Sequence, residues 1–128
     1  MIRMNNVAGI ILLVNELEVS ADFYQKLGFT VTKKVPDTAI TVSFGSFWIE
    51  LLHKSKVVSE EYTEDIPNPQ KGAGIYLQIQ VDNTDRYFEE ISNKGIMPAG
   101  SPRNFPWNHR EFIVVDPDGY KLAFFNSI

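Results

Sequence analysis

Residues 105–125 read FPWNHREFIVVDPDGYKLAFF, and this stretch decides the fold. The run at 110–115 is rich in residues that suit a half-buried strand, and DPDG at 116–119 has the chemistry of a tight turn. The proline presets φ for the second turn position, and the glycine can adopt a positive φ at little cost. With a returning strand at 120–125, the stretch predicts a β-hairpin, one face of which other elements must cover.

Length and composition limit the classes of protein to which this chain can belong. With 128 residues, 44% of them hydrophobic, it fits one globular domain with a sizeable core. A net charge of -4 argues against nucleic acid as a partner and gives no attraction to anionic lipid. The absence of cysteine excludes a disulfide framework, a thiolate nucleophile and a zinc site built on sulfur.

No membrane association is expected, because no stretch approaches the roughly 18 consecutive apolar residues that span a bilayer. The opening MIRMNNVAG also lacks the apolar region of a signal peptide. We therefore expect a soluble cytoplasmic protein, although a chain without cysteine fits an export compartment nearly as well.

The first half of the chain predicts one helix among four strands. A short apolar run at 9–14 fits a buried strand, and helical spacing over 19–27 ends at Gly28. Strands are then predicted at 29–35, 38–44 and 46–52. The order of elements is βαβββ.

The second half follows a polar segment at 54–73 that we interpret as a linker, because it contains prolines and shows no sustained period. Residues 75–81 alternate, with isoleucine, leucine and valine on one face and tyrosine and glutamine on the other. We expect the apolar face to meet a helix and the polar face to meet a cavity. A helix is predicted at 82–94, capped by Asp82 or Asn83 and ended by Gly95.

The two halves repeat each other. A shift of 67 residues superposes Val14 on Val81 and Gly28 on Gly95, and therefore strand end and helix end together. Such a repeat indicates two copies of a unit that cannot cover its own apolar face. We predict an α+β domain of two βαβββ modules, 1–53 and 74–128, with helices outside and curled mixed sheets around a shared cavity.

Three motifs resemble those of the vicinal oxygen chelate superfamily, which includes glyoxalase I, extradiol dioxygenases, fosfomycin-modifying enzymes and bleomycin-resistance proteins. They are V-x(8)-FY-x-x-LGF in the first half, V-D-x-x-D in the second, and PW-x-x-REF-x-V-x-DPDGY in the hairpin. The resemblance covers nearly the whole chain and implies the paired-module fold. It leaves the function open, since this scaffold supports several chemistries.

The resemblance also implies where a divalent metal would be held: Gly9, Glu50, Tyr76 and Ala123. Of these side chains only the Glu50 carboxylate binds such a metal well, because glycine and alanine offer no ligand atom and neutral tyrosine is a poor ligand. We therefore expect no metal cofactor. If the sheet curls tightly, an improvised metal site could instead group Glu50, His109 and Glu111, whereas His53 is expected at a solvated strand end.

Aromatic and polar side chains supply a candidate binding surface. Arg110 and Glu111 could fix the hairpin through a charge pair or hydrogen bonds, or could contact a ligand. Where a metal would lie in the family, we expect Tyr76, Trp48 and Gln78, with Glu50 as the only strong charge. The candidate ligand-binding residues are Trp48, Glu50, Tyr76, Gln78, Phe105, Trp107 and Glu111.

Three functions are compatible with these residues. The first is a metal-independent protein of the bleomycin-resistance type that sequesters a small aromatic or cationic molecule. The second is a metal-dependent enzyme, a glyoxalase-like lyase or dioxygenase with a non-standard site, and the missing metal ligands favour the first function over this one. The third is an interaction module with an empty cavity. The open sheet edges, together with the resemblance, predict a homodimer.

Overall fold

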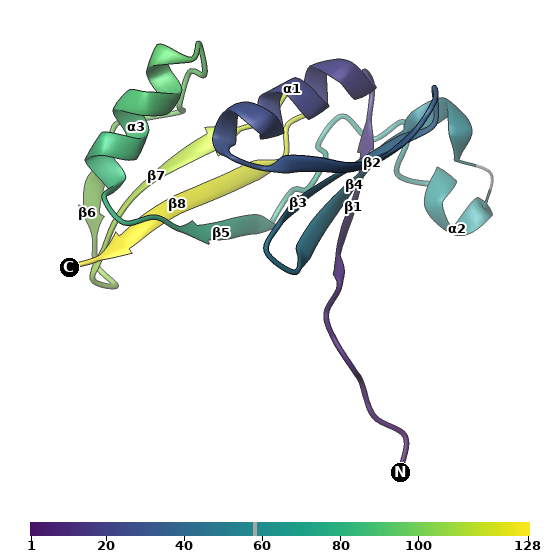
Figure 1. The fold of residues 1–128 in the computed structure, drawn as a ribbon, viewed down its shortest axis with the longest axis horizontal. Helices are drawn as coiled ribbons and strands as arrows, with labels where there is room; N and C mark the ends of the chain where they lie inside the picture. The colour runs from purple at the N-terminus through teal and green to yellow at the C-terminus, as the bar shows by residue number, and fades with distance from the viewer. Residues whose placement is uncertain (58) are drawn as a thin grey trace. The chain divides into compact units, whose positions relative to one another are not determined.

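The chain folds into two compact units, residues 1–68 and 69–128, in a computed structural model that describes residues 1–57 and 59–128. Each unit contains a four-stranded mixed sheet covered by a helix of ten or eleven residues (Figure 1). The strand order is β1-β4-β3-β2 in the first sheet and β5-β8-β7-β6 in the second. The predicted α+β fold of two βαβββ modules is confirmed, with sheets that do not close.

The first unit agrees with the predicted order of elements. Helix α1 begins at Leu17, two residues before the predicted start. Gly28 caps its C-terminal end, with a φ of 118° in the left-handed region that glycine adopts readily. The strands and helix of the βαβββ module are β1 (Gly9–Val14), α1 (Leu17–Leu27), β2 (Thr30–Val35), β3 (Ala39–Phe44) and β4 (Phe47–His53).

One face of the first sheet is buried under α1. Helix α1 contacts β2, β3 and β4, and Tyr24 on its inner side is 1% exposed. Val42 and Ile49 are paired across β3 and β4, and both are fully buried. Because side chains alternate along a strand, Trp48 and Glu50 point to the opposite, open face.

The predicted linker contains structure that the sequence pattern did not reveal. A 3-10 helix, η1 (Lys54–Lys56), follows β4 directly, and a short helix, α2 (Glu60–Thr63), lies within the same segment. His53 starts η1, since its Nδ1 accepts a hydrogen bond from the Ser55 amide. The first compact unit therefore extends beyond residue 53, and position 58 of the predicted linker lies outside the described residues.

The second unit has the same order of elements, and it includes a short strand that the sequence pattern did not indicate. Phe105 ends this strand, which is paired with β7. Asn83 is the helix cap, because its side chain accepts a hydrogen bond from the Arg86 amide. The strands and helix are β5 (Tyr76–Gln80), α3 (Thr84–Asn93), β6 (Arg103–Phe105), β7 (His109–Val115) and β8 (Lys121–Ser127).

Helix α3 covers one face of the second sheet through aromatic contacts. It lies along β7 and β8 (Figure 1), where the Tyr87 and Phe124 ring centroids are 4.8 Å apart and those of Phe88 and Phe112 are 5.3 Å apart. Ile79 is paired with Phe124 and therefore also faces α3. The prediction that Ile79 lies on the face of β5 that meets a helix is thus confirmed. In the described part of the chain, no helix has the length and apolar character needed to cross a membrane.

Candidate functional site

The open face of the second sheet carries a continuous row of side chains across four strands. The ladder registers place Gln80 beside Phe125, Phe125 beside Glu111, and Glu111 beside Arg103. Directly paired residues project to the same side of a sheet. Since Phe112 and Phe124 face α3, this row lies on the side that α3 leaves uncovered.

Glu111 is the buried polar residue of this row, with 5% of its surface exposed. Its Oε1 accepts hydrogen bonds from Trp107 Nε1 at 3.2 Å and from His109 Nδ1 at 3.3 Å. The described residues give Oε2 no donor. Because no fully buried side-chain N or O atom of the described chain lacks a partner, Oε2 must keep contact with solvent. One carboxylate oxygen is therefore held in place, and the other can accept a further hydrogen bond.

Aromatic rings surround this carboxylate. The His109 ring is stacked on Phe125, with centroids 4.1 Å apart and planes 16° apart. The Phe105 and Trp107 ring centroids are 4.9 Å apart, and Trp107 is 55% exposed. An apolar surface around a few fixed polar groups is the usual composition of a small-molecule site.

Arg110 holds β7 from the other side of the sheet. Its Nε and Nη2 donate to the two carboxylate oxygens of Asp85 on α3, each at 3.0 Å. These hydrogen bonds lower the pKa of Asp85 and raise the pKa of the Arg110 guanidinium. Arg110 therefore fixes the hairpin against α3, while Glu111 next to it faces the open side. Arg110 and Glu111 therefore do not form the charge pair that the sequence suggested. Arg110 binds Asp85, and Glu111 accepts hydrogen bonds from Trp107 and His109.

The residues predicted on the open face of the first sheet are more exposed than Glu111 and form fewer hydrogen bonds. Trp48 is 45% exposed, and Glu50 is half-buried between Ile11 and Thr41 on the neighbouring strands. Among the described residues Glu50 makes no hydrogen bond or ion pair through its carboxylate. These two predicted residues share one face, as expected, and they belong to the first compact unit.

The four positions that the family resemblance gives to metal ligands do not fit a divalent ion. A Cβ at Gly9 would lie 2.0 Å from the Trp48 carbonyl oxygen, so that position has no room for a side chain. Lys121 Nζ lies 5.3 Å from the Tyr76 ring centroid, and its positive charge opposes a cation there. Lys121 is thus a strong charge beside Tyr76 within the second unit.

The alternative metal group would join Glu50 of the first unit to His109 and Glu111 of the second. The described residues show no group of three or more His, Asp or Glu side chains that could hold a metal ion. His109 and Glu111 do point the same way, as the spacing indicated, but they form a hydrogen-bonded pair. A pair of this kind offers fewer ligands than a divalent metal site requires.

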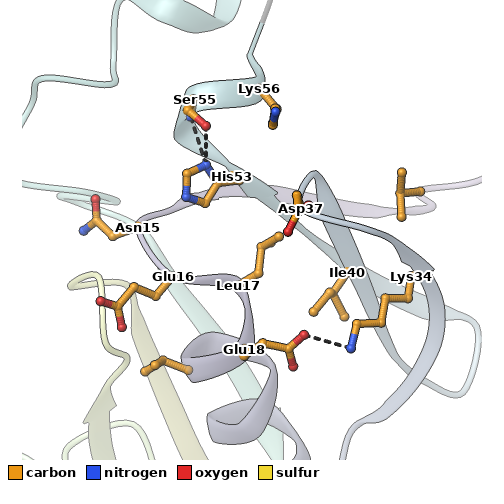
Figure 2. Close-up of a pocket in the computed structure, with 12 residues that line it drawn as sticks. Asn15, Glu16, Leu17, Glu18, Lys34, Asp37, Ile40, His53, Ser55 and Lys56 are labelled. Atoms are coloured by element: carbon orange, nitrogen blue, oxygen red, sulfur yellow. Dashed lines mark hydrogen bonds and ion pairs between the residues drawn. The ribbon is translucent and has the colours of Figure 1, made fainter.

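A separate pocket of about 490 Å³ lies in the first unit, between the start of α1, the β2–β3 hairpin and His53 (Figure 2). Its side chains already bind one another: Lys34 Nζ is 2.8 Å from Glu18 Oε1, and His53 Nδ1 is 2.7 Å from Ser55 Oγ. His53 lies at the end of β4, as predicted, is only partly buried and also borders this pocket. The described lining contains no Phe, Tyr or Trp ring on which a planar ligand could stack.

The structure brings some of the predicted residues together and separates others. Phe105, Trp107 and Glu111 form one cluster. Gln78 and Tyr76 lie two and four residues along β5 from Gln80, which places Tyr76 about 13 Å from the Glu111 row. Strand alternation predicted that Gln80 faces the cavity with Tyr76 and Gln78, although Gln80 was not among the candidate ligand-binding residues. The sequence prediction missed two other members of the cluster, Arg103 and Phe125.

Comparison with known proteins identifies one family. The model described as "Glyoxalase/Bleomycin resistance protein/Dioxygenase superfamily" matches residues 3–124. A bleomycin resistance protein of Geobacillus stearothermophilus is 29% identical over 123 residues, which cover 90% of this chain and 92% of that relative.

Solved structures show the same fold at low sequence identity. A glyoxalase/bleomycin resistance protein/dioxygenase from Nocardioides is 20% identical with a TM-score of 0.80, covering 100% of this chain and 87% of the other. TnmS3, an antibiotic binding protein from Streptomyces sp. CB03234, is 20% identical with a TM-score of 0.76, covering 100% of both chains.

Proposed function

We propose that this chain, which belongs to the glyoxalase/bleomycin resistance protein/dioxygenase superfamily, binds a small planar organic molecule without a metal ion. The observation that carries the proposal is the hydrogen bonding of the Glu111 carboxylate. Its carboxylate is buried and oriented by two ring N–H groups, yet Oε2 accepts no hydrogen bond from the described residues. A ligand that donates N–H groups completes this arrangement.

The aromatic surroundings define the shape of the ligand. Stacking against the exposed Trp107 ring favours a flat molecule, and the negative face of this ring attracts positive charge. A hydrogen bond to a charged partner contributes about 1.5–3 kcal/mol, more than a neutral one. An aromatic amidine, guanidine or amine therefore fits the site better than an aliphatic molecule of equal size.

Two further findings support binding without a metal. The backbone at Gly9 leaves no space for a ligand side chain, and Lys121 lies over Tyr76. The bleomycin resistance relative and the antibiotic binding structure also carry names that refer to organic compounds rather than to catalysis. Because both sheets have open edges, we also propose a homodimer as the binding species.

The proposal can be tested with a variant whose tryptophan fluorescence comes from Trp107 alone. In a Trp48→Phe variant, Trp107 is the single tryptophan of the chain. Titration with benzamidine and 2-aminobenzimidazole should change its fluorescence equally with and without EDTA. Affinity that disappears with EDTA, or that is confined to benzoate, would overturn the proposal.

A further inference from the structure

We propose that Arg103 is a second recognition residue of the Glu111 site, and that the site selects planar molecules carrying both a hydrogen-bond donor edge and an anionic or strongly accepting group. This inference rests on the proposed function, since it concerns the same face of the second unit. It replaces the simple cation as preferred ligand by a molecule with separated positive and negative ends.

The strand register brings Arg103 to the site. Arg103 on β6 is paired directly with Glu111 on β7. Residues paired in this way project to the same face, with Cβ atoms about 5 Å apart. A guanidinium on a flexible chain can therefore reach any molecule that touches the Glu111 carboxylate.

The two opposite charges do not neutralise each other in this structure. The Arg103 guanidinium carbon lies 3.8 Å from the centroid of the Phe105 ring, and Glu111 Oε1 is taken by Trp107 and His109. In the described part of the chain no ion pair joins Arg103 to Glu111. Stacking over a ring occupies the face of a guanidinium and leaves the N–H groups on its edge available to an acceptor.

Charge then decides which ligands the site favours. The charges of Glu111 and Arg103 in this row are opposite, so a simple cation is attracted by Glu111 but repelled by Arg103. A simple anion is attracted by Arg103 but repelled by Glu111. A zwitterion can satisfy Glu111 Oε2 with its donor edge and Arg103 with its acceptor, while its ring lies against Trp107.

Three probes with one ring test this selection by calorimetry: 3-amidinobenzoate, benzamidine and benzoate. We expect the wild type to bind 3-amidinobenzoate most tightly. Arg103→Gln should weaken that binding roughly tenfold while leaving benzamidine binding equal or stronger, since one charged hydrogen bond is lost and one repulsion is removed. Arg86→Gln is the matched control, because it removes the same charge from α3 on the covered side of the sheet.

The outcomes separate this inference from the proposed function. If benzamidine binds in a Glu111-dependent way but Arg103→Gln leaves 3-amidinobenzoate binding unchanged, the role of Arg103 is overturned and the proposed function stands. If Arg103→Gln weakens all three probes equally, Arg103 is structural and the inference is again overturned. If the wild type binds none of the probes, both proposals fail.

Discussion

Trp107 Nε1 donates a hydrogen bond of 3.2 Å to Glu111 Oε1, and this bond joins a half-exposed ring to a buried carboxylate. The indole is therefore more than a surface aromatic residue, since its position depends on the carboxylate beneath it. In return, Glu111 is held with one oxygen occupied. Orientation of this kind reduces the conformational entropy that the binding site loses when a ligand binds.

Replacing Trp107 should affect binding more than folding. Trp107→Ala removes the exposed ring and should weaken benzamidine binding by about 2 kcal/mol, the cost typical of an aromatic anchor. Trp107→Phe keeps a ring and should lose less. Thermal unfolding should change little, because more than half of this side chain is exposed. An alanine variant with wild-type affinity would remove Trp107 from the site.

Substitution of Gly9 should destabilise the first unit. A Cβ at this position would lie 2.0 Å from the Trp48 carbonyl oxygen, a backbone atom that cannot turn aside. Gly9→Ala should therefore lower the free energy of unfolding by about 1–3 kcal/mol, as overpacking does elsewhere. Gly100→Ala is the control, because nothing lies within 4 Å of its added Cβ. Equal urea midpoints for the two variants would contradict this account of the position.

The rows of the open face predict which polar residues matter for a small probe. Gln80 lies in the same cross-strand row as Phe125 and Glu111, whereas Tyr76 is four residues further along β5. Gln80→Ala should weaken benzamidine binding about threefold, in the range of one neutral hydrogen bond. Tyr76→Ala should have no effect at a separation of about 13 Å. Calorimetry showing the opposite order would mean that the ligand lies at the other end of the face.

Asp85 predicts a pH dependence of stability that is separate from binding. Its hydrogen bonds to Arg110 lower its pKa in the folded state. The unfolded chain therefore takes up a proton at a higher pH than the folded protein does, and the stabilisation is complete above the ordinary carboxyl pKa and lost as pH falls through the folded value. Since the pair is partly exposed, the effect should be small. Asp85→Asn should unfold with a weaker pH dependence below about pH 4, and an unchanged acid profile would contradict the pairing.

Most of the fold could be predicted from sequence because its signals are local. The DPDG turn, the glycines that end both helices, and the alternation of β5 each depend on neighbouring residues only. The short helix α2 could not be found in this way, since four residues show no period. Strand β6 was missed for a similar reason, because its three residues are defined by pairing with β7.

The site was only partly predictable, because it depends on register across strands. Alternation placed His109 and Glu111 on one face, but it could not indicate that Arg103 is opposite Glu111. That pairing is set by the turn between β6 and β7, where Asn108 has a φ of 61°. The same turn directs Trp107 toward Glu111, a contact that no spacing along the chain reveals.

The affinity of a Glu111→Gln variant for benzamidine, compared with that of the wild type in EDTA, tests the central claim most directly. Glutamine keeps the size of the side chain and one oxygen acceptor, so the fold should be preserved while the charge is lost. We predict a loss of about ten- to a hundredfold in affinity, equivalent to one charged hydrogen bond, with an unchanged unfolding midpoint as the control. Equal affinity in the two proteins would contradict the assignment of Glu111 as the ligand-binding carboxylate.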